Sequence, residues 1–256
     1  MQAAQDSSLA VESQQEEEKK FEAAILGQPL MARQVHARSS NYIPCTYIRK
    51  ESSSKLLLYF HGNAECLTLA ESQVCAIANY CNVSVLAMEY PGYGTYTGNG
   101  SAAADKITED AEYVYKFCLY DMGIDESDII VFGRSMGSGP SCYLAGTFNP
   151  RALCVMSGYT SIKRIAADQV GWLRIFVSER FENIVQVTKA RCPTFILHGR
   201  MDNVIPFHHG QDLYQASVGE PKTFIDRHQM THNDFNMNRD LLSPLQQFLI
   251  ESQIDT

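Results

Sequence analysis

Residues Gly133 to Gly137 read Gly-Arg-Ser-Met-Gly, so a serine stands between two glycines in the pattern G-x-S-x-G. An apolar run, Ile129–Phe132, precedes this pattern, and an apolar stretch typical of a helix, Met136–Ala145, follows it. At a strand-to-helix turn the pattern holds the serine hydroxyl on a sharp bend, where it can react as a nucleophile. We therefore predict that Ser135 is a nucleophile; the alternative is a glycine-rich turn without chemistry.

A serine hydroxyl needs a base to remove its proton, and that base needs an acid to orient it and to stabilise its charge. Asp202 follows the apolar run Thr194–Leu197, just beyond the expected end of a strand. His232 lies between the last expected strand and the final helix. A serine elbow of this kind is followed along the chain first by its acid and then by its histidine. We therefore predict Asp202 as the acid and His232 as the base.

Other acids and histidines remain as alternatives. Asp212 falls inside a helix-like stretch and Asp226 lies near the last expected strand, so both are weaker candidates for the acid. His228, shortly before His232, is the rival base. The remaining histidines away from the strand ends are expected to be ordinary surface residues: His36, His208 and His209.

A tetrahedral intermediate at Ser135 would carry negative charge on an oxygen, which is stabilised by fixed N–H donors. One donor is the backbone N–H after the nucleophile, and the other comes from the loop after an earlier strand. We predict Met136 as the first donor and Asn63, in the loop after the apolar run Leu56–Phe60, as the second. His61, at the start of that loop, is expected to orient it.

Two tyrosines and an arginine are candidates for contact with a substrate. Tyr90 and Tyr93 flank a Pro-Gly turn after the apolar run Val83–Met88, where they could line an acyl channel or act as packing residues. Arg134 beside the nucleophile could bind an anionic group. Such an arginine more often forms a structural ion pair, so it is left out of the predicted site.

Strand-like and helix-like stretches alternate from residue 42 onward. Apolar residues spaced by three or four, such as Val74 and Ile77, predict helices between the strands. This alternation predicts an α/β fold with a mostly parallel sheet covered on both faces. Ligands bind at the carboxyl ends of such strands, where the predicted site residues fall. The expected strands are Tyr42–Arg49, Leu56–Phe60, Val83–Met88, Ile129–Phe132, Leu153–Met156, Thr194–Leu197 and one within Val218–Asp226.

The two ends of the chain are less regular than its centre. Residues 1–40 are predicted to be a polar N-terminal tail and connector, and residues 41–256 the catalytic domain. The final helix is expected to begin or to kink at Ser243, which precedes Pro244. Residues 1–20 lack the apolar core of a signal peptide, so we expect a cytoplasmic protein, with any membrane contact peripheral.

The segment between the strands Leu153–Met156 and Thr194–Leu197 has room for only a small cap. Its apolar residues could roof a groove for an acyl chain or form an ordinary buried helix, and both interpretations stay open. They are Trp172, Leu173, Ile175 and Phe176.

The composition is that of an ordinary globular protein, with 256 residues, 45% of them hydrophobic and 20% charged. A net charge of -8 argues against a nucleic-acid-binding surface, which is basic. Eight cysteines without a Cys-x-x-Cys pair argue against a zinc site and a disulfide scaffold, so we expect reduced thiols. No metal or organic cofactor is expected, because serine, histidine and aspartate supply the nucleophile, the base and the charge stabilisation.

Several short segments together resemble the α/β-hydrolase-domain proteins of the depalmitoylating branch, which remove palmitate from membrane-anchored proteins. They lie in the same order over about residues 41–250: Tyr47–Arg49, Phe60–Ala64, Glu89–Gly94, Gly133–Gly139, Phe181–Ile184, His198–Asp202 and His232–Asp234. The resemblance implies the α/β-hydrolase fold and the catalytic residues Ser135, Asp202 and His232. The chain departs from the branch in having Cys45 as its first cysteine and Thr231 where a glycine is usual.

The expected function is hydrolysis of a fatty-acyl thioester or ester through an acyl-enzyme, with palmitoylated protein as the first candidate substrate. A lysophospholipase or monoacylglycerol lipase is the second candidate, because it has the same chemistry and a different leaving group. A third candidate, from another class, is a non-catalytic hydrolase-fold protein that binds a ligand or a partner. The sequence carries no signal for the oligomeric state.

Overall fold

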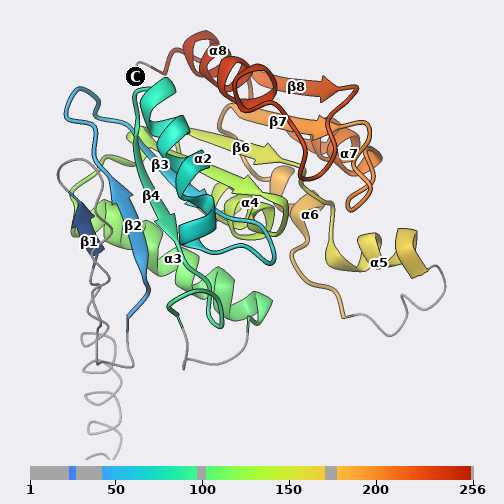
Figure 1. Cartoon of the computed structure of the whole chain (residues 1–256), viewed down its shortest axis with the longest axis horizontal. Coiled ribbons are helices and arrows are strands. Elements are labelled where there is room, and N and C mark those ends of the chain that lie inside the picture. The colour runs from blue at the N-terminus through green and yellow to red at the C-terminus, as the bar shows by residue number, and fades with distance from the viewer. Residues whose placement is uncertain (1–22, 27–41, 97–101, 171–177, 255–256) are drawn as a thin grey trace, which may run out of the picture.

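The computed structural model describes residues 23–26, 42–96, 102–170 and 178–254 of the chain. In this part a single sheet has the strand order β1-β2-β4-β3-β5-β6-β7-β8, and helices pack on both of its faces (Figure 1). Neighbouring strands are parallel except for β2 and β4, which are antiparallel. The predicted α/β class with a mostly parallel sheet is therefore confirmed.

The elements alternate along the chain much as the sequence predicts. The strands are β1 Ala23–Leu26, β2 Cys45–Ile48, β3 Leu56–Phe60, β4 Ser84–Met88, β5 Ile129–Arg134, β6 Ala152–Met156, β7 Thr194–Gly199 and β8 Lys222–Arg227. The helices are α2 Leu67–Tyr80, α3 Ala104–Tyr120, α4 Ser138–Thr147, α5 Ile162–Val170, α6 Asn183–Val187, α7 His208–Ala216 and α8 Ser243–Glu251. Short helical turns are η1 Glu126–Asp128, η2 Ser135–Gly137 and the π-helical η4 Met237–Leu242.

The central strands are apolar throughout because helices cover both of their faces. Successive side chains of a strand point to opposite faces, so a doubly covered strand needs an unbroken apolar run. In β3, Leu56, Leu58 and Phe60 join the core that contains α3 and α4. Leu57 and Tyr59 join the opposite core, which contains α2 and α8. This packing fixes the register of β3 and with it the position of the loop that follows.

The helices cover the sheet through apolar stripes. Ile107 and Val114 of α3 face one core, whereas Val74 of α2 and Leu245 of α8 face the other. These spacings of three, four or seven residues place side chains on one side of a helix. The helices therefore hold the sheet rigid and leave its carboxyl edge free for the connecting loops (Figure 1).

Some element boundaries differ from the prediction for physical reasons. Strand β5 continues to Arg134, because its pairing with β6 reaches the end of the strand. The helix expected from Met136 begins only at Ser138, because a tight turn, η2, comes first. The last strand is limited to Lys222–Arg227 at the half-buried edge of the sheet. The final helix begins at Ser243, with a proline in its first turn, as predicted.

Two predictions concern parts of the chain that the structure describes incompletely. Strand β1 lies within the predicted connector and pairs with β2, while the domain boundary at residue 41 stays a prediction. Of the expected cap, the structure describes α5 and α6. Its predicted apolar cluster lies outside the described residues: Trp172, Leu173, Ile175 and Phe176.

All eight cysteines belong to the described residues, and all are free thiols in the structure. Most are buried, and burial raises the pKa of the Cys81 thiol to about 12. The buried thiols are therefore packing residues rather than nucleophiles. No helix in the described part of the chain has both the length and the apolarity that a membrane crossing requires.

Candidate active site

The predicted nucleophile, acid and base meet at the carboxyl edge of the sheet. Ser135 follows β5 directly, Asp202 lies beyond β7 and His232 lies beyond β8. The Oγ of Ser135 lies 2.9 Å from Nε2 of His232, and Nδ1 of His232 lies 2.8 Å from Oδ2 of Asp202. Parallel strands end at one edge, so residues distant in the sequence become neighbours here. All three side chains are buried apart from a small exposed fraction.

Ser135 is held on a strained turn. Its φ of 52° is one that non-glycine residues rarely adopt. A Cβ on Gly133 would lie 2.2 Å from the carbonyl oxygen of Gly137, so the turn closes only around a glycine there. Below the turn, Oγ of Ser138 donates to the carbonyl oxygen of Ser135 at 2.7 Å. The surrounding contacts therefore maintain a conformation that is unfavourable by itself.

Asp202 is oriented by the backbone around it. Its Oδ1 accepts the N–H groups of Val204 at 3.0 Å and Ile205 at 2.8 Å, and its Oδ2 faces His232. Burial raises the pKa of this carboxyl, but the hydrogen bonds from His232 and from these N–H groups outweigh burial. The pKa therefore lies below its ordinary value. The resulting carboxylate keeps the proton of His232 on Nδ1 and leaves Nε2 free to accept the serine proton.

The loop after β3 lies against the nucleophile. A Cβ on Gly62 would lie 3.7 Å from Cβ of Ser135. The hydroxyl of Tyr93 links the two predicted N–H donor residues, because it donates to Oδ1 of Asn63 and lies 3.9 Å from Sδ of Met136. The structure thus brings Asn63 and Met136 together beside Ser135. Their role as donors to an intermediate stays a prediction.

His61 anchors this loop, as the sequence predicts. Its ring is fully buried, with Nδ1 2.9 Å from the carbonyl oxygen of Gly62 and Nε2 2.8 Å from Oε1 of Glu89. The Tyr90 hydroxyl donates to the carbonyl oxygen of His61 at 2.9 Å. Tyr90 has no exposed surface, so it supports the loop instead of lining a channel. Of the two predicted tyrosines, Tyr93 is the one that lies partly exposed at the site.

Arg134 forms the structural ion pair that its position suggested. Its NH1 donates to Oε2 of Glu65 at 3.0 Å, and its NH2 donates to the carbonyl oxygen of His232 at 3.2 Å and to Oδ1 of Asn233 at 2.9 Å. The same Oε2 of Glu65 accepts the N–H of Gly62 at 2.8 Å. Sequence reasoning missed Glu65, because no motif marks a carboxylate at this place in the loop.

Comparison with known proteins agrees with this fold. No protein-family model matches the chain. It is 31% identical over 221 residues to the alpha/beta hydrolase domain-containing protein aho-3 of Caenorhabditis elegans, covering 85% of this chain and 64% of that protein. It is 29% identical over 216 residues to the alpha/beta hydrolase domain-containing protein 17B of Xenopus tropicalis, covering 84% and 73%. The structure of Est1E from Butyrivibrio proteoclasticus with ferulic acid matches with a TM-score of 0.69 at 15% identity, covering 83% and 96%.

The chain has the α/β-hydrolase fold. Its strand order and its likeness to the solved structure show this, and the two similar proteins above are named for the same domain. The match spans slightly less than two thirds of the length of aho-3, so that protein is longer than the region compared. In this α/β-hydrolase the three residues that meet at the sheet edge are those that the resemblance implied.

The alternative acids and the alternative histidine that the sequence offered do not contact Ser135. Asp226 is paired with Arg200, whose Nε lies 3.0 and 2.9 Å from its two carboxylate oxygens. Asp212 lies on α7, with one of its oxygens 3.5 Å from Arg164. His228 is exposed just beyond β8. Among these candidates, Asp202 and His232 are the two that are hydrogen-bonded in line with Ser135, and their catalytic roles stay a prediction.

A second histidine, His198, lies beside Asp202 and was not singled out by sequence reasoning. Its ring is fully buried, with Nε2 2.9 Å from the carbonyl oxygen of Ile205 and 3.5 Å from Oδ2 of Asp202. Burial lowers the pKa of the His198 ring, which is therefore neutral and donates from Nε2 to that carbonyl. His198 thus supports the acid loop. Its place near the end of β7, ahead of Asp202, is the signal that could have indicated it.

The free energy of unfolding is expected to fall as the pH is lowered from about 7.5 to about 5.5. Burial lowers the pKa values of His198 and His209 in the folded state, so the unfolded chain binds more protons across this range. Stability supplied by the neutral rings is present above an unfolded pKa of about 6.5 and is lost below it. Urea unfolding at several pH values gives the free energy of unfolding at each pH. The slope of this free energy against pH should be smaller for His198→Gln than for the wild type. Equal slopes would contradict this assignment.

A cluster outside the site has the residue types of a metal centre: Asp168, His208 and His209, whose ligand atoms lie within 4.8 Å of one another. Nδ1 of His209 accepts the N–H of Thr160 at 3.2 Å, so its Nε2 carries the proton and donates to Asp168 at 2.9 Å. A histidine that binds a metal through Nε2 carries its proton on Nδ1 instead. The geometry is therefore a hydrogen-bonded link between α5 and α7. His209 is buried, which corrects its prediction as a surface residue.

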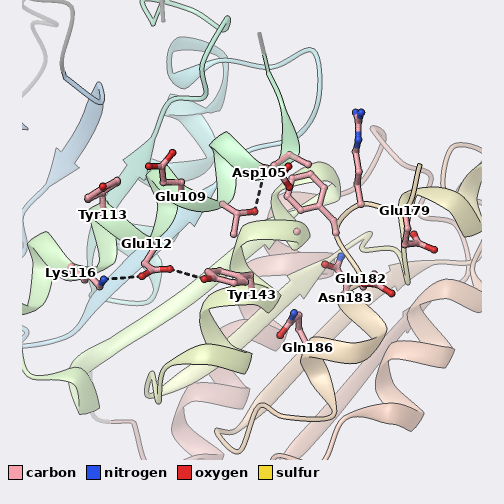
Figure 2. A pocket seen from close by; sticks show the side chains of 15 residues that line it. Asp105, Glu109, Glu112, Tyr113, Lys116, Tyr143, Glu179, Glu182, Asn183 and Gln186 are labelled. Atoms are coloured by element: carbon pink, nitrogen blue, oxygen red, sulfur yellow. Dashed lines mark hydrogen bonds and ion pairs between the residues drawn. The ribbon is translucent and has the colours of Figure 1, made fainter. Parts of the chain in front are cut away.

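A hollow of about 570 Å³ opens between α3, α4 and the chain that leads into α6 (Figure 2). Glu112 lies on its wall between Lys116 and Tyr143, with oxygens 2.8 and 2.6 Å from them. None of Ser135, Asp202 and His232 lines the hollow, so it is separate from the site. Its carboxylates are Asp105, Glu109, Glu112, Glu179 and Glu182, against the cations Lys116 and Arg180.

Proposed function

We propose that this α/β-hydrolase cleaves fatty-acyl thioesters and esters through an acyl-enzyme on Ser135, and that S-acylated proteins are its main substrates. The observation that carries the chemistry is the continuous set of hydrogen bonds from Ser135 through His232 to Asp202. Such a chain supplies a nucleophile, its base and the group that orients the base. The support for the leaving group is the resemblance to the depalmitoylating branch.

The first half-reaction forms the acyl-enzyme. Nε2 of His232 removes the hydroxyl proton of Ser135 while Oγ attacks the acyl carbonyl carbon. The N–H groups of Met136 and Asn63 stabilise the oxyanion of the tetrahedral intermediate. The intermediate collapses by breaking the carbon–sulfur bond of a thioester or the carbon–oxygen bond of an ester. The proton held by His232 passes to the leaving sulfur or oxygen.

The second half-reaction returns the free enzyme. A water molecule attacks the acyl carbonyl carbon and gives its proton to Nε2 of His232. Collapse of this intermediate breaks the bond to Oγ of Ser135, which takes the proton back, and the fatty acid leaves. Asp202 remains an anion throughout and stabilises the imidazolium that forms twice in the cycle.

Exposed apolar side chains beside the acid support an apolar substrate. Met201 and Val204, on either side of Asp202, have 59% and 41% of their surface exposed. Exposed apolar side chains so close in sequence to Asp202 suit contact with an acyl chain or with the surface of a membrane that carries acylated proteins. We accordingly propose peripheral contact with membranes at this edge.

A panel of acyl substrates tests the proposed function. The purified protein is assayed with an S-palmitoylated cysteine peptide, palmitoylglycerol and lysophosphatidylcholine, each in mixed micelles. We expect kcat/KM for the thioester peptide to exceed that for either lipid by at least about tenfold, a difference of about 1.4 kcal/mol in transition-state binding. The same panel with Ser135→Ala supplies the background rate.

Two results would contradict the proposal in different ways. Turnover of the glycerol or choline lipid alone would indicate a lipase or lysophospholipase. It would contradict the proposal that S-acylated proteins are the substrates. The other result is that the folded protein turns over none of the substrates and does not react with a fluorophosphonate probe. This result would contradict an enzymatic function and favour a binding protein with a hydrolase fold.

A further inference from the structure

We propose that the Glu65–Arg134 ion pair is a positioning device that locks the loop after β3 to the loop that carries His232. The proposal rests on the acyl-enzyme chemistry proposed above. Two parts of the site contact this pair, the N–H of Gly62 and the carbonyl oxygen of His232, and Arg134 itself is the residue before Ser135. One pair of side chains thus joins the predicted oxyanion loop, the nucleophile and the base.

The hydrogen bonds of the pair are directed at the backbone of the catalytic loops. Oε2 of Glu65 accepts both NH1 of Arg134, at 3.0 Å, and the N–H of Gly62, at 2.8 Å. NH2 of Arg134 reaches the carbonyl oxygen of His232 and the side chain of Asn233. A planar guanidinium can satisfy these separate acceptors at once, which an ammonium cannot.

The loop after β3 is shaped to admit the pair. A Cβ on Gly62 would lie 3.2 Å from NH1 of Arg134 and 3.2 Å from Oε2 of Glu65, so the ion pair fits closely under this glycine. The neighbouring Ala64 has a φ of 57°, in the region that side chains rarely adopt. The hydrogen bond from Gly62 to Glu65 spans this strained residue. The carboxylate therefore stabilises the turn that contains Asn63.

The pair is sheltered from water, which makes its geometry more definite than that of a surface ion pair. The side chains of Arg134 and Glu65 are 11% and 15% exposed. Nε of Arg134 is buried and has no hydrogen-bond partner among the described residues. NH1 and NH2 of Arg134 are the nitrogens that form hydrogen bonds, and their acceptors lie in the two loops beside Ser135. This distribution of contacts favours a positioning role over a purely stabilising one.

Kinetics of side-chain variants test the positioning role. With p-nitrophenyl butyrate, Arg134→Gln should lower kcat by roughly 10- to 100-fold and change KM by less than about twofold, because misplaced catalytic groups slow the chemical step. Arg134→Lys should fall between this variant and the wild type, since lysine can pair with Glu65 but cannot hold the other acceptors as well. Glu65→Gln combined with Arg134→Gln should be no slower than the slower single variant by more than about threefold.

A matched ion pair at the opposite end of the same strands is the control. Lys55 and Asp128 precede β3 and β5 and form an ion pair with side chains 15% and 23% exposed. Lys55→Gln should lower the melting temperature and leave kcat within about twofold of the wild type. An equal loss of kcat in Lys55→Gln and Arg134→Gln would overturn the proposal, because general destabilisation would then explain both.

The remaining outcomes are also decisive. Wild-type kcat in Arg134→Gln, or a raised KM at unchanged kcat, overturns the positioning role and leaves the enzyme intact. Absence of fluorophosphonate labelling in the folded wild type overturns the proposed function itself. If Arg134→Gln does not fold, Glu65→Gln takes its place. A Glu65→Gln protein with wild-type kcat would likewise overturn the proposal.

Discussion

Replacement of Ser135 by alanine is expected to reduce hydrolysis by roughly 10⁴-fold or more and to abolish labelling by a fluorophosphonate probe. Oγ of Ser135 lies 2.9 Å from Nε2 of His232. Removal of this oxygen leaves the predicted base without a nucleophile to activate. The folded structure should persist, because the change removes one oxygen and keeps the backbone of the turn. Single-turnover assays and gel fluorescence measure the two losses.

A buried serine nearby is the control for this experiment. Ser141 lies on α4, and its hydroxyl donates to the carbonyl oxygen of Ser138 at 3.3 Å. Ser141→Ala should keep both turnover and probe labelling within about threefold of the wild type, since its hydroxyl contacts neither His232 nor Asp202. Labelling that survives in Ser135→Ala would place the reactive group elsewhere in the chain.

Replacement of Gly137 by alanine is expected to destabilise the protein by at least about 3 kcal/mol. A Cβ at this position would lie 2.1 Å from the carbonyl oxygen of Phe60 and 2.8 Å from that of His61. Both are backbone atoms at the start of the loop after β3, so no side-chain rotation can relieve the contact. Urea unfolding, or recovery of soluble protein if the variant does not fold, measures the loss.

Gly123→Ala is the control for this experiment, because it shows the general effect of replacing a glycine without the clash expected at Gly137. The φ of Gly123 is 67°, and a Cβ there would meet nothing within 4 Å. Gly123→Ala should therefore cost only the backbone strain, about 1 to 2 kcal/mol. If the two variants lost the same stability, the close approach of Gly137 to Phe60 would not be the cause.

The centre of the fold could be predicted from the sequence because burial leaves few choices of residue. The range Leu56–Phe60 is the same in the prediction and in the structure, since a strand covered on both faces must be apolar throughout. The last strand was harder to delimit. Lys222–Arg227 is half-buried at the edge of the sheet and contains polar residues, so neither a continuous nor an alternating pattern marks its ends.

The reacting residues could be predicted because chemistry restricts both their types and their order. Ser135, Asp202 and His232 each follow a strand, and the sheet brings strand ends together. His198 was marked by its place near the end of β7, but Glu65 could not be found in the same way. The contact of Glu65 with Arg134 joins residues 69 positions apart through a loop, and it depends on backbone angles that no periodicity encodes.

The separation of Ser135 from His232 has a consequence for the newly made protein. These residues are 97 positions apart, so the nucleophile leaves the ribosome before its base has been synthesised. At about 5 to 20 residues per second, the interval between the synthesis of Ser135 and that of His232 is roughly 5 to 20 seconds. During that time the growing chain carries a serine hydroxyl that nothing activates. Under the proposed function, reactivity toward acyl groups therefore begins only when β7 and β8 have joined the sheet, and an unfinished chain does not react.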